Sequence, residues 1–347
     1  MKKEDNEFEL IYTDIRRKYQ DKFDKWNKDI KLSKILYAAL VAFLLVVVLI
    51  LFATPFKTLL ATNKGTFYAT IIAIVVVAVV IVAYASSLRS RYKKEYKATV
   101  VTDLVNRTNS NFAFSEKCAD NGAGLKNAYE DAGLDRLSLM GLGQMLSGVR
   151  RSMEVQTCNY IEGTTQTNIM TRMSEVAVYD VKKITRVENG SVSQSTERKN
   201  IFDGFFAHVS IPTAVPVDFS VFTNDPTPRD YYNDDVRTNK GGQRVSMGNL
   251  ESWMGLCVYS EQPEKLETYA TEEMGRIIRD MDKKSLIKTD IALKGNNIYI
   301  RLHQHSFINP DLKDENKNKA KLKACYDMLK FIEEFAIEVN ETNKAKK

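Results

Sequence analysis

The chain has 347 residues, 44% of them hydrophobic and 10% aromatic, which is enough apolar material for a packed core and argues against disorder. Its net charge of +6 comes from the N-terminal part, because residues 1–107 hold 18 Lys/Arg against 10 Asp/Glu and the rest hold 32 against 34. A nearly neutral C-terminal part lacks the basic surface that a phosphate backbone requires. We therefore expect no nucleic acid partner.

Residues 1–34 are predicted to form a cytosolic amphipathic helix. Its apolar stripe is rich in aromatic residues at helical spacing and includes Phe8, Tyr19 and Trp26. A second stripe, which includes Tyr92 and Tyr96, runs through the predicted helical extension over residues 89–107. Either the two stripes pack together as a stalk, or the first helix lies on the lipid headgroups. The presence of a second stripe favours the stalk.

Two uncharged runs of 22 residues, 35–56 and 67–88, are each long enough to cross a hydrocarbon core of about 30 Å. They predict two transmembrane helices joined by an outer loop over residues 57–66. Neither run contains an ionisable residue of the kind that pumps and ion paths require. We interpret the hairpin as an anchor in the lipid bilayer.

Basic residues flank the hairpin on the side away from its connecting loop. By the positive-inside rule, this distribution places both chain ends in the cytoplasm. The same flank is a candidate contact for anionic lipid headgroups. Its members are Lys31, Lys34, Arg89, Arg91, Lys93 and Lys94.

Residues 108–347 are predicted to form a cytosolic α+β domain with a β-rich part over 150–249 and an α/β part over 250–340. The β-rich part has strand patterns at 153–163, 175–181, 201–211 and 215–223, which favour an antiparallel sheet. The polar segment 224–243 is predicted to be a surface loop. A short helix is expected at 124–134, before a glycine-spaced segment at 141–148 that fits no phosphate-binding fingerprint.

The α/β part is predicted to be a strand-helix-hairpin-helix unit. Its expected elements are a strand at 253–261, a helix at 264–281, a hairpin of 285–294 and 297–304 around Gly295-Asn296, and a helix at 317–339. The predicted fold class is thus a membrane-anchored α+β protein with an N-terminal two-helix transmembrane hairpin, helical cytosolic extensions, an antiparallel sheet and this unit.

Common catalytic and metal signatures do not occur in the sequence, so we predict no catalytic residue, metal site or cofactor. His303 and His305 would share one face of a strand, a geometry compatible with zinc, but a surface pair is favoured because no third ligand follows. The cysteines form no C-x-x-C pair and are expected to be buried, reduced thiols: Cys118, Cys158, Cys257 and Cys325.

Short motifs in this domain resemble a known family. They are Glu162-Gly163 with Ser174-Glu175, the segment Phe202-Asp203-Gly204-Phe205-Phe206, and Leu256-Cys257-Val258-Tyr259-Ser260 with Ala270-Thr271. With the two membrane spans before them, they make the chain similar to the bacterial membrane-protein family of domain of unknown function 3137. The resemblance implies a membrane anchor and a cytosolic α/β domain. The expected location is the bacterial inner membrane. It implies no established activity and no catalytic residues.

Around Gly204, the phenylalanines are interpreted as core packing with a close backbone approach at the glycine, and the alternative is the wall of a ligand pocket. The candidate binding residues are Phe202, Gly204, Phe206 and Tyr259. We predict a binding or scaffolding module with a protein partner or a small ligand. An enzyme without a common motif and a lipid-headgroup sensor are the alternatives.

Overall fold

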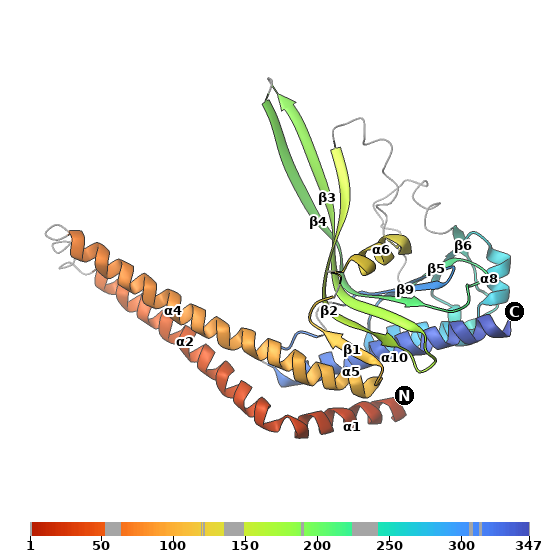
Figure 1. Ribbon diagram of the computed structural model, residues 1–347, viewed down its shortest axis with the longest axis horizontal. Helices are drawn as coiled ribbons and strands as arrows, with labels where there is room; N and C mark the ends of the chain where they lie inside the picture. Colours follow the sequence, from red (N-terminus) through yellow and green to blue (C-terminus); the bar gives the residue numbers. More distant parts are fainter. Residues whose placement is uncertain are drawn as a thin grey trace. The chain divides into compact units, whose positions relative to one another are not determined.

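The computed structural model describes residues 2–52, 64–118, 120, 122–134, 149–188, 191–223, 242–304, 308–311 and 314–346 (Figure 1). The chain divides into two compact units. The first unit comprises Met1–Val100 with Asn309–Asn318, and the second comprises Val101–Ile308 with Lys319–Lys347.

The long helices among the described residues of the first unit are α1 (Lys2–Lys18), α2 (Gln20–Phe52) and α4 (Lys64–Tyr96). Two helical stretches, Gln20–Leu49 and Tyr68–Thr108, are long and apolar enough to cross a membrane. Only 11% and 6% of their most apolar windows are buried within the protein, which differs from the core helix of a soluble domain. These two helices suggest association with a membrane.

Aromatic side chains join the polar ends of α2 and α4. The Trp26 ring lies 5.5 Å from Tyr92 and 6.0 Å from Tyr96, and its Nε1 donates a hydrogen bond of 2.8 Å to Glu95. The two stripes therefore pack on each other, as the stalk alternative predicts. The helix expected over residues 1–34 is divided into α1, which ends at Lys18, and α2, which begins at Gln20. Backbone hydrogen bonds of 3.0 Å from the Tyr19 amide to Ile15 and from the Phe23 amide to Tyr19 continue the helical pattern across this junction.

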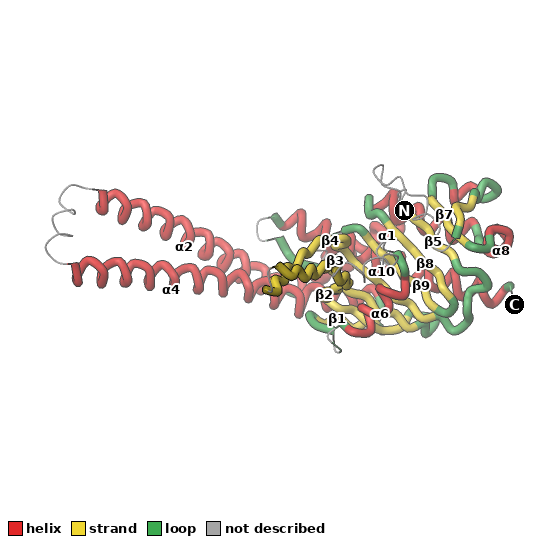
Figure 2. The backbone as a smooth tube through the Cα atoms, turned by 90° about the horizontal axis from the view of Figure 1, so that it is seen from above, coloured by secondary structure: helices red, strands yellow, loops and turns green. Residues whose placement is uncertain are grey.

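A single antiparallel sheet of nine strands forms the centre of the second unit, in the order β1-β2-β3-β4-β9-β8-β5-β7-β6 (Figure 2). Strands from the predicted β-rich part and from the predicted α/β part thus share one sheet. In chain order the strands are β1 (Phe112–Ser115), β2 (Val149–Thr164), β3 (Met170–Glu188), β4 (Ser191–Ser210), β5 (Phe219–Phe222), β6 (Gln243–Val245), β7 (Cys257–Ser260), β8 (Thr289–Lys294) and β9 (Asn297–Leu302).

Helices lie on both faces of this sheet. On one face lies α6 (Ala123–Ala132), the helix expected at 124–134, and on the other lies α10 (Glu315–Ala345), which extends beyond the predicted 317–339 (Figure 1). The side of α6 toward the sheet buries Leu125, Ala128 and Tyr129. Gly133 ends the helix with φ +61°, a left-handed conformation that glycine adopts without steric cost.

Three strands are much longer than the others. The strands β2, β3 and β4 have 16, 19 and 20 residues, whereas β8 and β9 have six each. Their far ends extend beyond the part of the sheet that α6 covers (Figure 1). All side chains from Ser193 to Asn200 of β4 are exposed. We call residues 179–200 of β3 and β4 the hairpin extension.

Two predictions for the α/β part are corrected. The helix expected at 264–281 is two helices, α8 (Pro263–Tyr269) and α9 (Glu272–Ser285), because extended Thr271 accepts a hydrogen bond from the Met274 amide and caps α9. The strand expected at 253–261 shortens to β7, since Trp253 closes a 3₁₀ turn and Gly255 has φ +87°.

The hairpin prediction at Gly295-Asn296 is confirmed by the pairing of Lys294 with Asn297. The predicted segment 141–148 lies outside the described residues. Residues 224–241 of the predicted surface loop also lie outside the described residues. The last residue of that predicted loop, Gln243, is the first residue of β6.

Candidate functional site

A pair of opposite charges is buried on the face of the sheet that α6 covers. The strand register places Arg301 of β9 opposite Asp290 of β8. Phe206 pairs with Arg301 on one side and Phe222 pairs with Asp290 on the other. The side chains of Asp290 and Arg301 are only 7% and 9% exposed. The charges are therefore flanked by aromatic residues within the sheet.

One carboxylate oxygen of Asp290 contacts two basic side chains. Its Oδ2 accepts hydrogen bonds from Arg301 Nε at 2.9 Å and from His303 Nε2 at 2.6 Å. His303, directly after β9, is 41% exposed, far more than its two partners. The buried pair thus continues to the protein surface through one imidazole ring. We call Asp290, Arg301 and His303 the charged triad.

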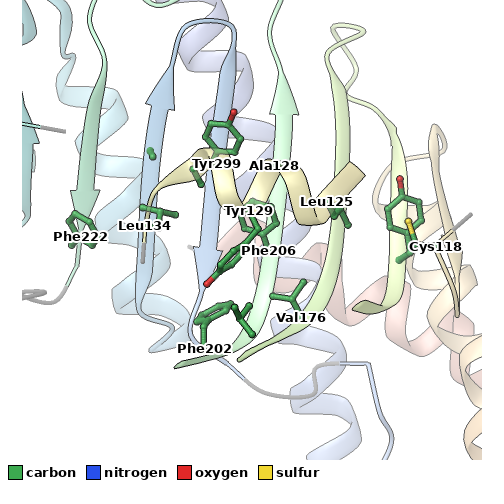
Figure 3. Close-up of a cluster of buried hydrophobic side chains, with 14 of the residues drawn as sticks. Cys118, Leu125, Ala128, Tyr129, Leu134, Val176, Phe202, Phe206, Phe222 and Tyr299 are labelled. Atoms are coloured by element: carbon green, nitrogen blue, oxygen red, sulfur yellow. The ribbon is translucent and has the colours of Figure 1, made fainter. Parts of the chain in front are cut away.

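Aromatic side chains enclose the charged triad. The Arg301 guanidinium lies 5.0 Å from the centre of the Phe202 ring, and His303 meets the same ring edge-on at 5.2 Å. Arg301 Nη1 also donates a hydrogen bond to the Tyr129 hydroxyl at 3.4 Å, which links the triad to α6. Figure 3 shows Phe202, Phe206 and Tyr129 together under this helix.

The charged form of Asp290 is favoured despite its burial. Loss of water by itself would raise the pKa of the carboxyl group, but the Arg301 charge and the bonds from His303 and Arg301 outweigh that effect and lower the pKa. Asp290 is therefore an ionised acceptor at neutral pH.

The predicted binding residues fall in this same region, mainly as core. Phe202, Phe206 and Tyr259 are buried in one hydrophobic cluster with Tyr129 and Phe222. Phe206 meets Tyr129 edge-on at 5.0 Å, and Tyr259 meets Phe222 edge-on at 5.7 Å. The interpretation of the phenylalanines as core packing is confirmed.

Gly204 of β4 lies against the backbone of β9 and against the Phe202 ring. A Cβ atom there would collide with the Leu302 carbonyl oxygen and with the Phe202 ring. Only glycine leaves room for this close backbone approach, as predicted. The position therefore fixes the Phe202 ring beside the charged triad.

Sequence reasoning missed three members of the site: Tyr129, Asp290 and Arg301. His303 was noted only as half of a surface pair with His305, which lies outside the described residues. A usable signal existed, because Asp290 and Arg301 are equally distant from the Gly295-Asn296 turn and must therefore face each other across the hairpin. Among the described residues, no group of three or more His, Cys, Asp or Glu side chains is arranged to hold a metal ion.

No family model, curated protein or solved structure matches the chain.

A second histidine on the same face gives a structural contrast to His303. His208 of β4 shares a hydrogen bond of 2.9 Å with the Asn297 side chain and stacks on the Tyr299 ring at 5.3 Å. Burial lowers its pKa, which favours the neutral ring. The partner of His208 is thus an amide oxygen and not a carboxylate, so His208 is a matched control for the triad histidine.

Glu175 is a buried carboxylate with a structural role. It accepts hydrogen bonds from the Ile308 amide at 3.1 Å and from the Asn159 side chain. Asn159, with φ +55°, lies at the bulge where β2 shifts register against β3. The same carboxylate accepts from the Cys158 thiol at 3.7 Å. The cluster holds the bulge and the segment at Ile308 together.

One prediction for the cysteines is wrong. All four are described and none forms a disulfide, but Cys158 is exposed while the other three are buried. The bulge after Cys158 explains this difference, because it interrupts the alternation of faces along β2. Burial raises the pKa of Cys325 to about 12, so that thiol is unreactive at neutral pH.

The predicted basic flank divides into two groups. Arg89 donates to the Ser33 hydroxyl at 2.8 Å and lies 4.4 Å from the Tyr37 ring, and Arg91 pairs with Glu95 at 2.7 Å. Arg89 therefore connects α4 to α2, and the Arg91–Glu95 pair lies within α4. The four lysines of the flank are exposed: Lys31, Lys34, Lys93 and Lys94.

Proposed function

We propose that the chain is a membrane-anchored binding module whose ligand contacts His303. The observation that carries this proposal is the burial of Asp290 and Arg301 between Phe206 and Phe222, where they hold a half-exposed histidine. Apolar side chains of similar volume fill such positions at equal or lower cost, because buried ions lose their hydration. Stability alone therefore does not explain the buried pair, whereas a role in holding His303 in place does.

The anchor in this proposal is the helical hairpin of α2 and α4 in the inner membrane, with both chain ends in the cytoplasm. Its support is the excess of basic residues on the inner flank and the exposure of the two apolar helices. The four exposed lysines would lie near anionic headgroups, so a lipid contact accompanies the binding function. Membership in the family of domain of unknown function 3137 remains a prediction.

An enzyme is the second candidate, and the hydrogen bond from His303 Nε2 to Asp290 favours it. A carboxylate that orients a histidine and stabilises its protonated form is the usual arrangement of a general base. The binding module is preferred because the arrangement supplies a base and no recognised nucleophile motif. Turnover of a bound compound would reverse this preference.

The proposal is tested with full-length protein in lipid nanodiscs and a library of small polar fragments. Ligand-observed magnetic resonance is recorded with the wild type, with His303→Phe and, as the matched control, with His208→Phe. We expect fragments that bind the wild type and the control and lose at least tenfold in affinity for His303→Phe. Equal binding to all three proteins would contradict the proposal, and consumption of a fragment would favour the enzyme.

A scaffold also binds a protein partner. The hairpin extension is the candidate surface for that partner. Its β4 side chains from 193 to 200 are exposed and polar. In a variant with residues 183–196 replaced by Asn-Gly, the new turn joins Lys182 to Glu197. These two residues already pair, so the register of the remaining parts of β3 and β4 is kept. Loss of a partner on cross-linking in membranes, with fragment binding retained, would assign the partner to the extension.

A further inference from the structure

The proton positions in the charged triad follow from its geometry. Asp290 Oδ2 is 2.9 Å from Arg301 Nε and 2.6 Å from His303 Nε2. An arginine side chain only donates hydrogen bonds, so the carboxylate beside it is held in the ionised form, and an ionised carboxylate only accepts them. The lowered pKa of Asp290 agrees with this assignment.

Because Asp290 only accepts, the proton of the neutral His303 ring must be on Nε2. A neutral imidazole has one protonated and one unprotonated nitrogen. The lone pair is therefore on Nδ1, the nitrogen that does not face Asp290. The ring cannot rotate to exchange the two without losing the bond of 2.6 Å, and the edge-on contact with Phe202 limits its rotation further.

We propose that His303 Nδ1 is a hydrogen-bond acceptor that selects ligands with an O–H or N–H donor, such as an alcohol, a phenol or an amide. The inference rests on the proposed function, because it names the class of ligand for that same site. While the His303 ring is neutral, carboxylates and other anions without a proton are excluded from direct contact with Nδ1, since two acceptors facing each other repel.

The neighbouring charges strengthen this preference. Arg301 is the nearest cation, but its guanidinium is 9% exposed and already bound to Asp290 and to the Tyr129 hydroxyl. It is therefore not presented to an anionic ligand. At the surface of the site, the exposed polar group of the triad is the His303 ring.

The first measurement is the tautomer of His303 in the full-length protein. Histidine labelled with ¹⁵N in the ring is incorporated, and the three histidines are assigned with His303→Phe and His208→Phe. In the neutral form of the ring we expect Nε2 to give the signal of a protonated nitrogen and Nδ1 that of an unprotonated one. In Asp290→Asn the side-chain amide donates as well as accepts, so the Nδ1–H form should become populated. A protonated Nδ1 in the neutral wild-type ring would overturn the inference.

The second measurement uses three probes of similar shape: phenol, anisole and benzoate. Phenol should shift the His303 Nδ1 signal, and the other two should shift it at least fivefold less at equal concentration. A larger shift with benzoate than with phenol would overturn the ligand class and leave the proposed function intact. If Nδ1 is unprotonated but no probe or fragment shifts it, both the proposed function and the ligand class fail.

Discussion

Two arginine–carboxylate pairs in the same sheet have similar partners and opposite surroundings. In the centre, Arg301 binds Asp290 and lies over the Phe202 ring; in the hairpin extension, Arg198 binds Glu154 at 2.8 Å and lies 3.8 Å from the Tyr179 ring. The central side chains are 9% and 7% exposed, and the outer ones are 41% and 45% exposed. The two pairs therefore differ in burial and not in the type of residues that form them.

The comparison teaches which of the two pairs is informative about function. In water, an ion pair contributes between zero and about 1 kcal/mol and is easily formed by strand neighbours. In the core, each ion loses several kcal/mol of hydration, so the pair persists only with additional bonds. The central pair has those bonds, from His303 and to Tyr129.

The largest expected difference between the two pairs is the effect of removing one arginine. Arg301→Met leaves the buried Asp290 carboxylate with the half-exposed His303 as its remaining partner and should lower the free energy of unfolding by up to about 3–5 kcal/mol. Denaturant titration of the full-length protein in detergent, followed by circular dichroism, measures this. The double variant Asp290→Leu, Arg301→Met should recover most of the loss. A single variant as stable as the wild type would show that the central pair is not electrostatically isolated.

Acid should reduce stability at the central pair. The pKa of Asp290 is lower in the folded protein than its ordinary value of 3.8, so its contribution is complete above the unfolded pKa and is lost as pH falls through the folded pKa. We expect the free energy of unfolding to fall below about pH 4. Asp290→Asn should make this part of the pH profile flatter. An unchanged profile in that variant would assign the acid sensitivity to other carboxylates.

A smaller effect is expected from crowding the ring beside the triad. In Gly204→Ala the new methyl group collides with the Leu302 carbonyl oxygen and the Phe202 ring. Overpacking of this kind costs about 1–3 kcal/mol. Thermal unfolding measures this cost. Gly248→Ala is the control, because a Cβ atom there would lie at an ordinary contact distance of 3.7 Å from the Ser246 hydroxyl. Equal melting temperatures for the two variants would contradict the close approach at Gly204.

The smallest effect should come from the outer pair. Arg198→Met removes the bond to Glu154 and the contact with Tyr179, and should cost less than about 1 kcal/mol. The same denaturant titration compares it directly with Arg301→Met. A loss as large as that of Arg301→Met would mean that the hairpin extension is buried by a partner under the conditions used.

Local patterns predicted much of the fold. The Gly295-Asn296 turn, the apolar stripe of α10 and the alternation in β3 are all contained in short stretches of sequence. The division of α8 from α9 was also readable, since Thr271 is followed by Glu272 and Glu273 in the first turn of a helix. It was missed because the apolar spacing continues across the break.

The site depends on contacts that local patterns do not specify. The pairing of β4 with β9 brings Phe206 beside Arg301, and α6 places Tyr129 over both. These residues are far apart in the chain, and no periodicity records which strands become neighbours. Asp290 and Arg301 could have been paired from the hairpin register, but their burial could not, because it comes from Phe202, Phe206 and α6.

The two tryptophans of the chain lie in different units. Trp26, in the first unit, donates its indole hydrogen bond to Glu95, and Trp253, in the second, donates to the Thr271 carbonyl oxygen. Both rings are buried. Each unit therefore contains one tryptophan whose fluorescence can be excited selectively over that of tyrosine. Replacing either tryptophan with phenylalanine leaves an emission signal that follows the loosening of the other unit alone, without an added dye.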